Sequence, residues 1–327
     1  MSRANSQKKK TSLKMLGLMI TLVVVFFNAV AFNHARSMLI FTDNGIRTEK
    51  PEELGLREKT LVLIKGINVP RPKNEATPKL YGLSYEVYQI NVTSEIILEG
   101  WLISHENSRG HILMFHGYAT AKSSILPEAA ALHEMGYDVF MVDFRGSGGS
   151  SLSQTSIGYY ESDDVAASAQ FVEKNFGWDN LVFYGQSMGS VAILKSVNDG
   201  KIHPSKIIIE SVYDKTLSAV NNRFDSMNIP SFPSSYVLVF WGSIIEKFNG
   251  FTHNPLDYAR SVQCPIMLMH GDSDPRATLD QARNVYVEIQ SEKRLIVFEN
   301  AVHESLYTSN PQKWNTEVLE FLDNNSG

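Results

Sequence analysis

The chain has a single cysteine among its 327 residues, Cys264. One thiol cannot form a disulfide within its own chain, and it cannot by itself build a cysteine-ligated metal site. Histidine, aspartate and glutamate do not fall at metal-ligand spacings, and no cofactor-binding motif occurs. We therefore expect neither a metal nor a cofactor in this protein.

The chain also lacks an excess of positive charge, because it has 30 lysines and arginines against 35 aspartates and glutamates, a net charge of −5. Residues 1–14 contain five basic residues and no acid, so the rest of the chain carries a net charge of about −10. No basic stripe with interleaved aromatic residues occurs. This acidic body argues against nucleic acid as a partner, and no protein partner is indicated.

Long apolar runs are absent except at residues 15–32, which contain no charged residue. As a helix this run would extend about 27 Å, enough to cross the hydrocarbon core of a bilayer. Its length favours a retained anchor, whereas the basic segment before it and the Ala29–Ala31 sequence near its end are typical of a cleaved signal peptide. In both cases the positive charges predict a cytoplasmic amino terminus and an extracytoplasmic body.

Composition divides the chain into four parts. These are a basic cytoplasmic tail at 1–14, a transmembrane anchor (or signal peptide) at 15–33, a juxtamembrane segment at 34–80 and a globular domain at 81–325. In the juxtamembrane segment a helix is expected over 51–65. Pro70, Pro72 and Pro78 then favour an extended tether.

From residue 81 onward, strand and helix patterns alternate. Two alternating segments, 85–91 and 95–104, predict an antiparallel hairpin at a sheet edge. Further strands are expected at 111–116, 138–143, 180–185, 206–212, 265–270 and 293–298. Helices are expected at 124–135, 161–175, 188–198, 278–288 and 311–323. The alternation predicts an α/β fold with a doubly wound, mostly parallel sheet.

The alternation is interrupted at residues 214–263, which we interpret as a helical cap. The segment is rich in aromatic residues, and its stretch 236–248 is apolar nearly all round. A helix of that kind must be buried or face lipid. In the simpler interpretation it packs on the core. In the other, Phe240 and Trp241 line an apolar substrate channel, or the helix enters the bilayer beside the anchor.

The most informative motif is the Gly-x-Ser-x-Gly sequence at 185–189, in which the serine is Ser187. The motif alone would occur by chance in about one chain in ten of this length. Here an apolar, strand-like stretch precedes it and a helix-like stretch follows it. A serine on such a sharp turn exposes its hydroxyl, and the two glycines are needed because a Cβ would clash with the turn or the neighbouring strand. Ser187 is therefore the candidate nucleophile.

A serine hydroxyl needs a base to take its proton and an acid to orient that base. His303 follows the strand at 293–298, and two acids, Asp272 and Asp274, follow the strand at 265–270. Both positions lie at the carboxyl ends of strands, where open α/β sheets place their sites. The order serine, aspartate, histidine along the chain is the one that the α/β-hydrolase architecture requires.

With these motifs the chain resembles the α/β-hydrolase superfamily over roughly residues 33 to 325. The acid of that superfamily usually lies three residues after the glycine of a His-Gly-x-x-Asp segment, which implies Asp274 as the acid and leaves Asp272 as a turn residue. The His-Gly-x pattern that begins at His116 implies an oxyanion hole formed by the backbone N–H groups of Tyr118 and Met188. In the same interpretation His116 braces the loop.

A second loop, at 143–150, resembles the Asp-x-Arg-Gly-x-Gly-x-Ser loop of the superfamily. It lacks the lysine of a phosphate-binding loop and the spacing of a dinucleotide fingerprint. We expect Arg145 to tie this loop down through a carboxylate such as Glu161 or Asp164.

The body looks most similar to the cap-bearing branch that includes serine aminopeptidases, acylglycerol lipases and esterases. The segment 33–38 resembles bacterial membrane-anchored α/β-hydrolases. The resemblance implies a serine hydrolase that cleaves carboxylic esters through an acyl-enzyme on Ser187, with a small acyl substrate, lipids included. An amidase, a peptidase or a thioesterase would use the same residues. A catalytically inactive binding protein is the alternative from a different class, since one fold hosts many functions.

Overall fold

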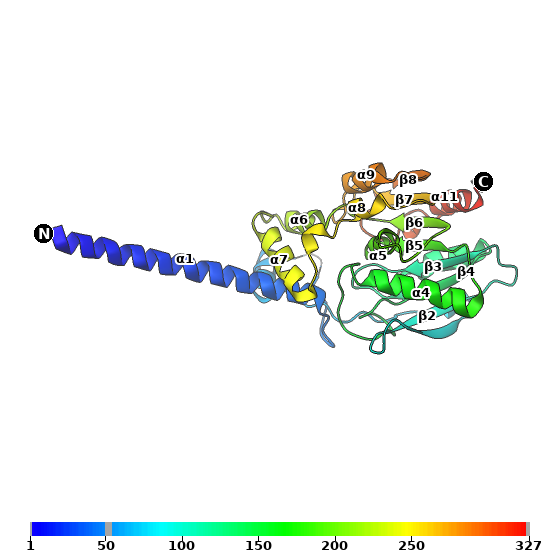
Figure 1. Cartoon of the computed structure of the whole chain (residues 1–327), viewed down its shortest axis with the longest axis horizontal. Helices are drawn as coiled ribbons and strands as arrows, with labels where there is room; N and C mark the ends of the chain where they lie inside the picture. Colours follow the sequence, from blue (N-terminus) through cyan, green and yellow to red (C-terminus); the bar gives the residue numbers. More distant parts are fainter. Residues whose placement is uncertain (1, 50–53, 325–327) are drawn as a thin grey trace.

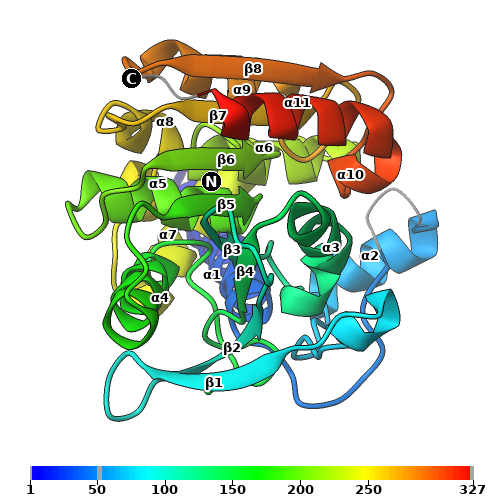
Figure 2. The same cartoon turned by 90° about the vertical axis from the view of Figure 1, so that its right-hand side faces the viewer.

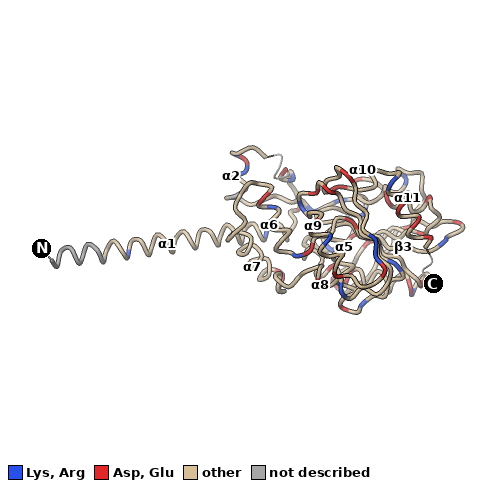
Figure 3. Tube along the Cα trace, turned by 90° about the horizontal axis from the view of Figure 1, so that it is seen from above, with Lys and Arg blue, Asp and Glu red and all other residues tan. Residues whose placement is uncertain are grey.

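The computed structural model describes residues 2–49 and 54–324. Its first element, helix α1 (Ser2–Leu39), is a long rod that projects from the body formed by the rest of the chain (Figure 1). From Thr11 to Leu39 this helix is long and apolar enough to cross a membrane. Between Lys14 and Arg36 it carries no lysine, arginine, aspartate or glutamate, so this stretch of the helix is uncharged (Figure 3).

The helix thus runs past residue 33, the predicted end of the anchor. In the juxtamembrane segment, helix α2 (Leu56–Lys65) and the short helix η1 (Pro78–Tyr81) form. The predicted start of the first of these, at residue 51, lies outside the described residues, as does residue 325, the predicted end of the domain. Between the two helices the chain is extended and pairs with the segment after α1 through a bridge between Thr42 and Pro70.

The body is built on an eight-stranded sheet with the order β1-β2-β4-β3-β5-β6-β7-β8. Its strands are β1 (Glu86–Asn91), β2 (Ile97–Ile103), β3 (His111–Phe115), β4 (Asp138–Val142), β5 (Val182–Gln186), β6 (Lys206–Glu210), β7 (Ile266–Gly271) and β8 (Lys293–Phe298). The first two strands pair antiparallel at one edge, and β3 to β8 are parallel. The predicted hairpin and parallel sheet are confirmed.

Helices cover both faces of the sheet (Figure 2). Helices α4 (Glu161–Phe176), α5 (Met188–Asn198), α8 (Pro255–Ala259) and α9 (Leu279–Glu288) pack on one face. Helices α3 (Leu126–Glu134), which the short helix η2 (Lys122–Ile125) precedes, α10 (Leu306–Ser309) and α11 (Pro311–Asp323) pack on the other. Two hydrophobic cores result, one on each face, and burial of their apolar side chains is the main source of stability.

The segment predicted to be a cap contains α6 (Thr216–Ser226), α7 (Ser234–Glu246) and η3 (Gly250–Thr252), with α8 at its end. The apolar stretch forms α7, which lies alongside the last third of α1 (Figure 1). On α1, the buried residues Ala31, Ala35 and Leu39 recur every four residues and form one face. Small side chains on that face allow the two helices to approach closely.

Candidate active site

Ser187 lies on the sharp turn between β5 and α5, with φ 51° and ψ −110°. A positive φ is uncommon for a residue with a side chain, so this turn is strained. Both glycines of the motif are required because other backbone atoms approach their Cα atoms too closely to leave room for a Cβ. A Cβ on Gly185 would lie 2.6 Å from the carbonyl carbon of Gly189, and one on Gly189 would lie 2.3 Å from the carbonyl oxygen of Phe115 on β3. The Ser187 hydroxyl therefore stands at the carboxyl end of the sheet.

The structure brings Ser187, His303 and Asp274 together from the carboxyl ends of β5, β8 and β7. The Nε2 atom of His303 lies 3.1 Å from Oγ of Ser187. On the other side of the ring, Nδ1 lies 2.7 Å from Oδ2 of Asp274. These distances allow a proton to pass from the serine to the imidazole while the carboxylate fixes the ring orientation.

The Asp274 carboxyl is buried, and its second oxygen is also occupied. Oδ1 accepts hydrogen bonds from the backbone N–H groups of Arg276, at 2.8 Å, and Ala277, at 3.0 Å. Burial acts to raise the pKa of Asp274, but the hydrogen bond and charge of His303 and these two N–H groups outweigh it and hold the pKa below its ordinary value. The carboxyl is therefore ionised at neutral pH.

Asp272, the competing acid, serves a different purpose. It is exposed, and its Oδ1 accepts hydrogen bonds from the backbone N–H of Asn300, at 2.8 Å, and from the Ser273 hydroxyl, at 2.9 Å. It thus joins the loop after β7 to the loop after β8. Of the two acids, the one that contacts His303 is Asp274.

The two residues predicted to form the oxyanion hole flank Ser187. Met188 is the first residue of α5, so its N–H is one of the helix donors that have no acceptor within the helix. The loop of Tyr118 lies on the other side, because a Cβ on Gly117 would be 3.6 Å from Cβ of Ser187. An acyl oxygen bound between these loops would face donors from both.

His116 and Arg145, both predicted to brace loops, hold the loops around the site in place. The buried His116 accepts a hydrogen bond from the N–H of Phe144, at 3.1 Å, and its other ring nitrogen lies 2.8 Å from the Gly117 carbonyl. Burial lowers the pKa of His116, which keeps the ring neutral. Arg145 binds Asp164 with Nη2 2.6 Å from Oδ1, as predicted for this loop.

A pair of buried carboxyl groups beneath the site was missed from the sequence. The main-chain oxygen of Glu210 accepts from the N–H of Ser187 at 2.8 Å, and its side chain accepts from the indole N–H of Trp314 at 2.7 Å. Glu128 accepts from the Ser305 hydroxyl, two residues beyond His303. Burial raises the pKa of Glu128 to about 8 and that of Glu210 to about 7. The sequence contains one indication of this pair, which is that Glu210 ends the apolar strand β6.

Phe240 and Trp241 lie where the cap meets α1. The Trp241 indole N–H donates to the Asn28 side chain at 3.2 Å, and its ring packs edge-on against Phe32 at 5.3 Å. Phe240 packs against Trp241 and is nearly half exposed. Trp241 therefore packs against the part of α1 around residues 28–32.

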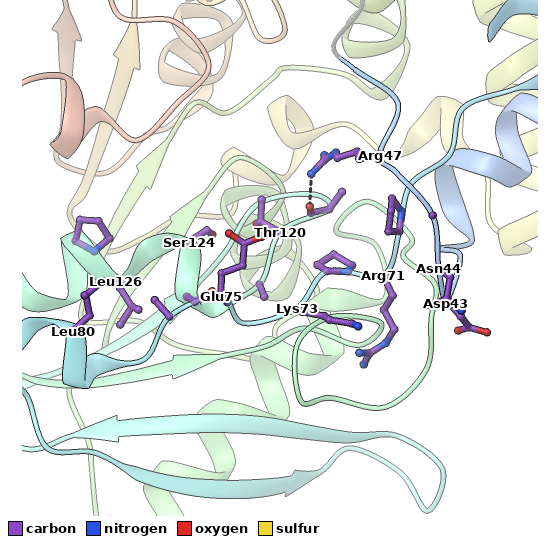
Figure 4. Close-up of a pocket in the computed structure, with 18 of the residues that line it drawn as sticks. Asp43, Asn44, Arg47, Arg71, Lys73, Glu75, Leu80, Thr120, Ser124 and Leu126 are labelled. Carbon is purple, nitrogen blue, oxygen red and sulfur yellow. Dashed lines mark hydrogen bonds between the residues drawn. The ribbon is translucent and has the colours of Figure 1, made fainter. Parts of the chain in front are cut away.

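A cavity of about 790 Å³ opens beside the Tyr118 loop (Figure 4). Its walls come from the juxtamembrane segment and from the loop and helix that follow β3, and Arg47 reaches across it to the carbonyl of Ala119 at 3.0 Å (Figure 4). Arg71, on the same wall, donates to the carbonyls of Leu152 and Gly148 at 2.9 Å each. Within residues 2–49 and 54–324, no three His, Cys, Asp or Glu side chains cluster in a way that could hold a metal ion.

This strand order, with a serine elbow and a histidine and an aspartate at the strand ends, defines an α/β-hydrolase. Residues 124–327 match the sequence profile of the prolyl oligopeptidase family, and the chain belongs to that family. Two relatives are the uncharacterised protein YqkD of Bacillus subtilis and protein bem46 of Schizosaccharomyces pombe. The first is 24% identical over 69% of this chain and 75% of that protein, and the second is 24% identical over 66% and 70%.

Solved structures share the fold. An esterase of Pyrococcus furiosus superposes with a TM-score of 0.65 at 23% identity, covering 78% of this chain and 98% of that one. An acylaminoacyl peptidase of Pyrococcus horikoshii gives 0.57 at 18% identity, covering 74% and 41%. A bacterial membrane phospholipase A gives 0.55 at 16% identity, covering 75% and 87%. The chain is thus a hydrolase of the esterase- and peptidase-like kind.

Proposed function

We propose that this protein is a serine hydrolase that cleaves carboxylic esters through an acyl-enzyme on Ser187. The observation that carries the proposal is the continuous pair of hydrogen bonds from Ser187 to His303 and from His303 to Asp274, at 3.1 and 2.7 Å. Each group lies at a strand end on a rigid sheet, which fixes the geometry before a substrate arrives.

In this mechanism His303 takes the Ser187 proton while the serine oxygen attacks the acyl carbon. The backbone N–H groups of Met188 and Tyr118 stabilise the negative oxygen of the tetrahedral intermediate. His303 then gives the proton to the departing alcohol, which leaves the acyl group bonded to Ser187. A water molecule, deprotonated by the same imidazole, attacks this ester and releases the acid. The ionised Asp274 stabilises the imidazolium in both halves.

A peptidase or amidase is the second candidate, since the family to which the chain belongs is named for oligopeptide cleavage and one structural relative is an acylaminoacyl peptidase. Cleavage of an amide would use the same steps, with an amine as the leaving group. The ester proposal is supported by the esterase, of which 98% is matched, compared with 41% of the acylaminoacyl peptidase. The apolar helix α7 of the cap supports it as well. A thioester would also fit the same groups.

We further propose that α1 stays on the mature protein as a single-pass anchor, with the catalytic domain on the extracytoplasmic side. The hydrogen bond between Trp241 and Asn28 and the buried face of Ala31, Ala35 and Leu39 support retention. Cleavage after Ala31 would remove Asn28 and Ala31 from this contact. The basic residues before the apolar run support the orientation.

The exposed face of α7 supports lipid acyl esters as the substrate class. Tyr236, Phe240 and Ile244 are all exposed, and their spacing of four places them on one face of the helix. Phe232, which lies just before the helix, is exposed as well. Apolar faces of this kind mark contacts with membranes or partners. Next to an anchor helix, this face would meet hydrocarbon.

The test uses the full-length chain in detergent micelles. A fluorophosphonate probe should label the wild-type protein and not Ser187→Ala, and Ser187→Ala should lose about three orders of magnitude in kcat while it keeps its melting temperature. Parallel assays with p-nitrophenyl esters and aminoacyl anilides then separate an esterase from a peptidase. Undiminished ester hydrolysis by Ser187→Ala would overturn the assignment of the nucleophile. Absence of any labelling would favour the non-catalytic alternative.

A further inference from the structure

The last turn of α1 contacts the Tyr118 loop and the segment around Thr155. The last carbonyl groups of a helix find no N–H donor within that helix, so they need donors from elsewhere. The carbonyl of Met38 accepts a hydrogen bond from the Tyr118 hydroxyl at 2.7 Å. The next carbonyl, of Leu39, accepts from the N–H of Thr155 at 2.9 Å, and the Thr155 hydroxyl lies 3.3 Å from the sulfur of Met188. The end of α1 therefore contacts both sides of the oxyanion site, directly or through one residue.

The segment after α1 holds the same loop at two further points. The ring of Phe41 packs against that of Tyr118, with centroids 6.2 Å apart. The guanidinium of Arg47 donates to the carbonyl of Ala119 at 3.0 Å (Figure 4). Ala119 is buried and has a φ of 53°, in the left-handed region that residues with a side chain rarely adopt. Such a conformation persists only where the surroundings enforce it, and here part of these surroundings is residues 38–47.

We propose that the end of helix α1 is a working part of the active site, in which the Tyr118 hydroxyl is a positioning group. By binding the Met38 carbonyl, it holds the main-chain N–H of its own residue where the negative oxygen develops. The inference rests on the proposed function. An oxyanion donor works only within about 2.7–3.1 Å of that oxygen. A small shift of the loop therefore reduces the stabilisation of the transition state more than it reduces the binding of the substrate.

The state of the Tyr118 hydroxyl suits this role. Burial raises its pKa, and the charges of Arg223, Arg47 and Arg276 oppose this without outweighing it. The hydroxyl therefore remains protonated and able to donate at neutral pH. The geometry thus links the anchor to the chemistry through a neutral hydrogen bond, which salt screens little.

The chain offers a matched pair of substitutions to test the link. Tyr118→Phe removes the hydrogen bond to Met38. Tyr160→Phe removes a bond of the same kind, since the Tyr160 hydroxyl donates to the carbonyl of Glu246, the last residue of α7, at 3.0 Å. Full-length variants in detergent micelles are compared by kcat and KM on p-nitrophenyl butyrate, by the rate of fluorophosphonate labelling and by melting temperature.

We expect Tyr118→Phe to lower kcat and the labelling rate by about tenfold or more, with KM within about twofold, because oxyanion stabilisation is lost. Tyr160→Phe should stay within about twofold of wild type in both rates at a similar melting temperature. Arg47→Gln, which releases the same loop without changing the Tyr118 side chain, should also lower kcat at unchanged KM. It keeps the inference testable should Tyr118→Phe fail to fold.

Three results would overturn the inference. One is labelling and turnover at the wild-type rate in both Tyr118→Phe and Arg47→Gln. The second is an equal loss in Tyr118→Phe and Tyr160→Phe that follows melting temperature, which would reduce the bond to a stabilising contact. A loss that appears in KM alone would place the hydroxyl in substrate binding instead. Failure of the proposed function is separate, since the wild-type protein would then not be labelled at all.

Discussion

The indole N–H of Trp241 donates a hydrogen bond to the side-chain oxygen of Asn28, 3.2 Å away, and so joins the cap to the helix proposed as the anchor. The Asn28 amide in turn donates to the carbonyl of Val24 at 2.9 Å, within its own helix. An asparagine in an apolar run is costly unless its polar atoms are bonded. The pairing with Trp241 offsets that cost, and it joins α7 to α1.

The cap should set a preference for acyl-chain length. If α7 touches lipid or the acyl chain, each buried methylene adds up to about 0.8 kcal/mol, so kcat/KM should rise from acetyl to medium or long chains. Phe240→Ala and Trp241→Ala should flatten this rise while short-chain turnover stays nearly intact. Trp241→Ala should also lower the melting temperature, because it loses Asn28 and Phe32. The measurement is kcat/KM across C2 to C12 p-nitrophenyl esters for each variant.

Val287→Ala provides the control for that experiment, since Val287 is an exposed apolar residue on α9. It should change neither the profile nor the melting temperature appreciably. A cap helix that only packs would lose stability on substitution with no change in the profile. A profile that peaks at acetyl, or a preference for aminoacyl amides, would contradict the lipid proposal and favour a peptidase.

The two neighbouring acids should differ sharply in their effect on turnover. Asp274→Asn should lower kcat by about 10⁴-fold, because the amide no longer stabilises the required imidazole tautomer and its imidazolium form. Asp272→Asn should cost less than about tenfold, since that side chain only joins two loops. Steady-state kinetics of both variants on one ester decide the matter, and a reversed ranking would show that Asp272 is the acid.

The apolar helix should remain on the mature protein. We expect the full-length chain to stay in the membrane fraction after a carbonate wash, which releases peripheral proteins. Terminal sequencing provides the second measurement. A mature amino terminus at Phe32 would instead establish a cleaved signal peptide.

The buried pair Glu128 and Glu210 should make stability fall as pH rises. Both carboxyls have raised pKa values in the folded state, to about 8 and about 7, so the folded chain holds protons that the unfolded chain loses above about pH 4.5. The contribution of this pair to the free energy of unfolding is therefore largest near or below pH 4.5. It declines as the pH rises to about 8. Glu128→Gln should raise the melting temperature at pH 8 and change it little at pH 5.

Glu134→Gln is the matched control for the pair, because Glu134 is exposed at the end of the same helix, α3. It should leave the difference between pH 5 and pH 8 as it is in the wild-type protein. An unchanged pH dependence in Glu128→Gln would contradict the argument, since burial of that carboxyl would then carry no proton linkage.

The sheet was predictable because buried parallel strands appear in a sequence as short, continuous apolar runs. The strands β3, β5 and β7 follow this rule, and these three and the edge strand β8 each end within about one residue of their predicted ends. The candidate residues could then be found as the polar residues that follow these runs. The choice between Asp272 and Asp274 could not be made from pattern alone, because both follow the same strand, and it needed a resemblance to a known fold.

Other features depend on contacts between distant parts of the chain. Nothing in the apolar run shows that Asn28 meets Trp241, because 213 residues separate them. The bond between Met38 and Tyr118 spans 80 residues, and that between Glu128 and Ser305 spans 177. Such contacts depend on how the elements pack in the folded chain, and the local sequence pattern does not indicate that packing. The extension of α1 to Leu39 went unpredicted for the same reason, since its last turn is stabilised by those partners.

The order of synthesis gives the capped end of α1 a further consequence. This helix leaves the ribosome first, whereas the donors to Met38 and Asn28 follow 80 and 213 residues later. During that interval its last carbonyls and the Asn28 oxygen have no partner from the body. Contacts between residues so far apart in sequence form late in folding. The junction between α1 and the body should thus close only after α7 has been made, more than 200 residues after Asn28 has left the ribosome.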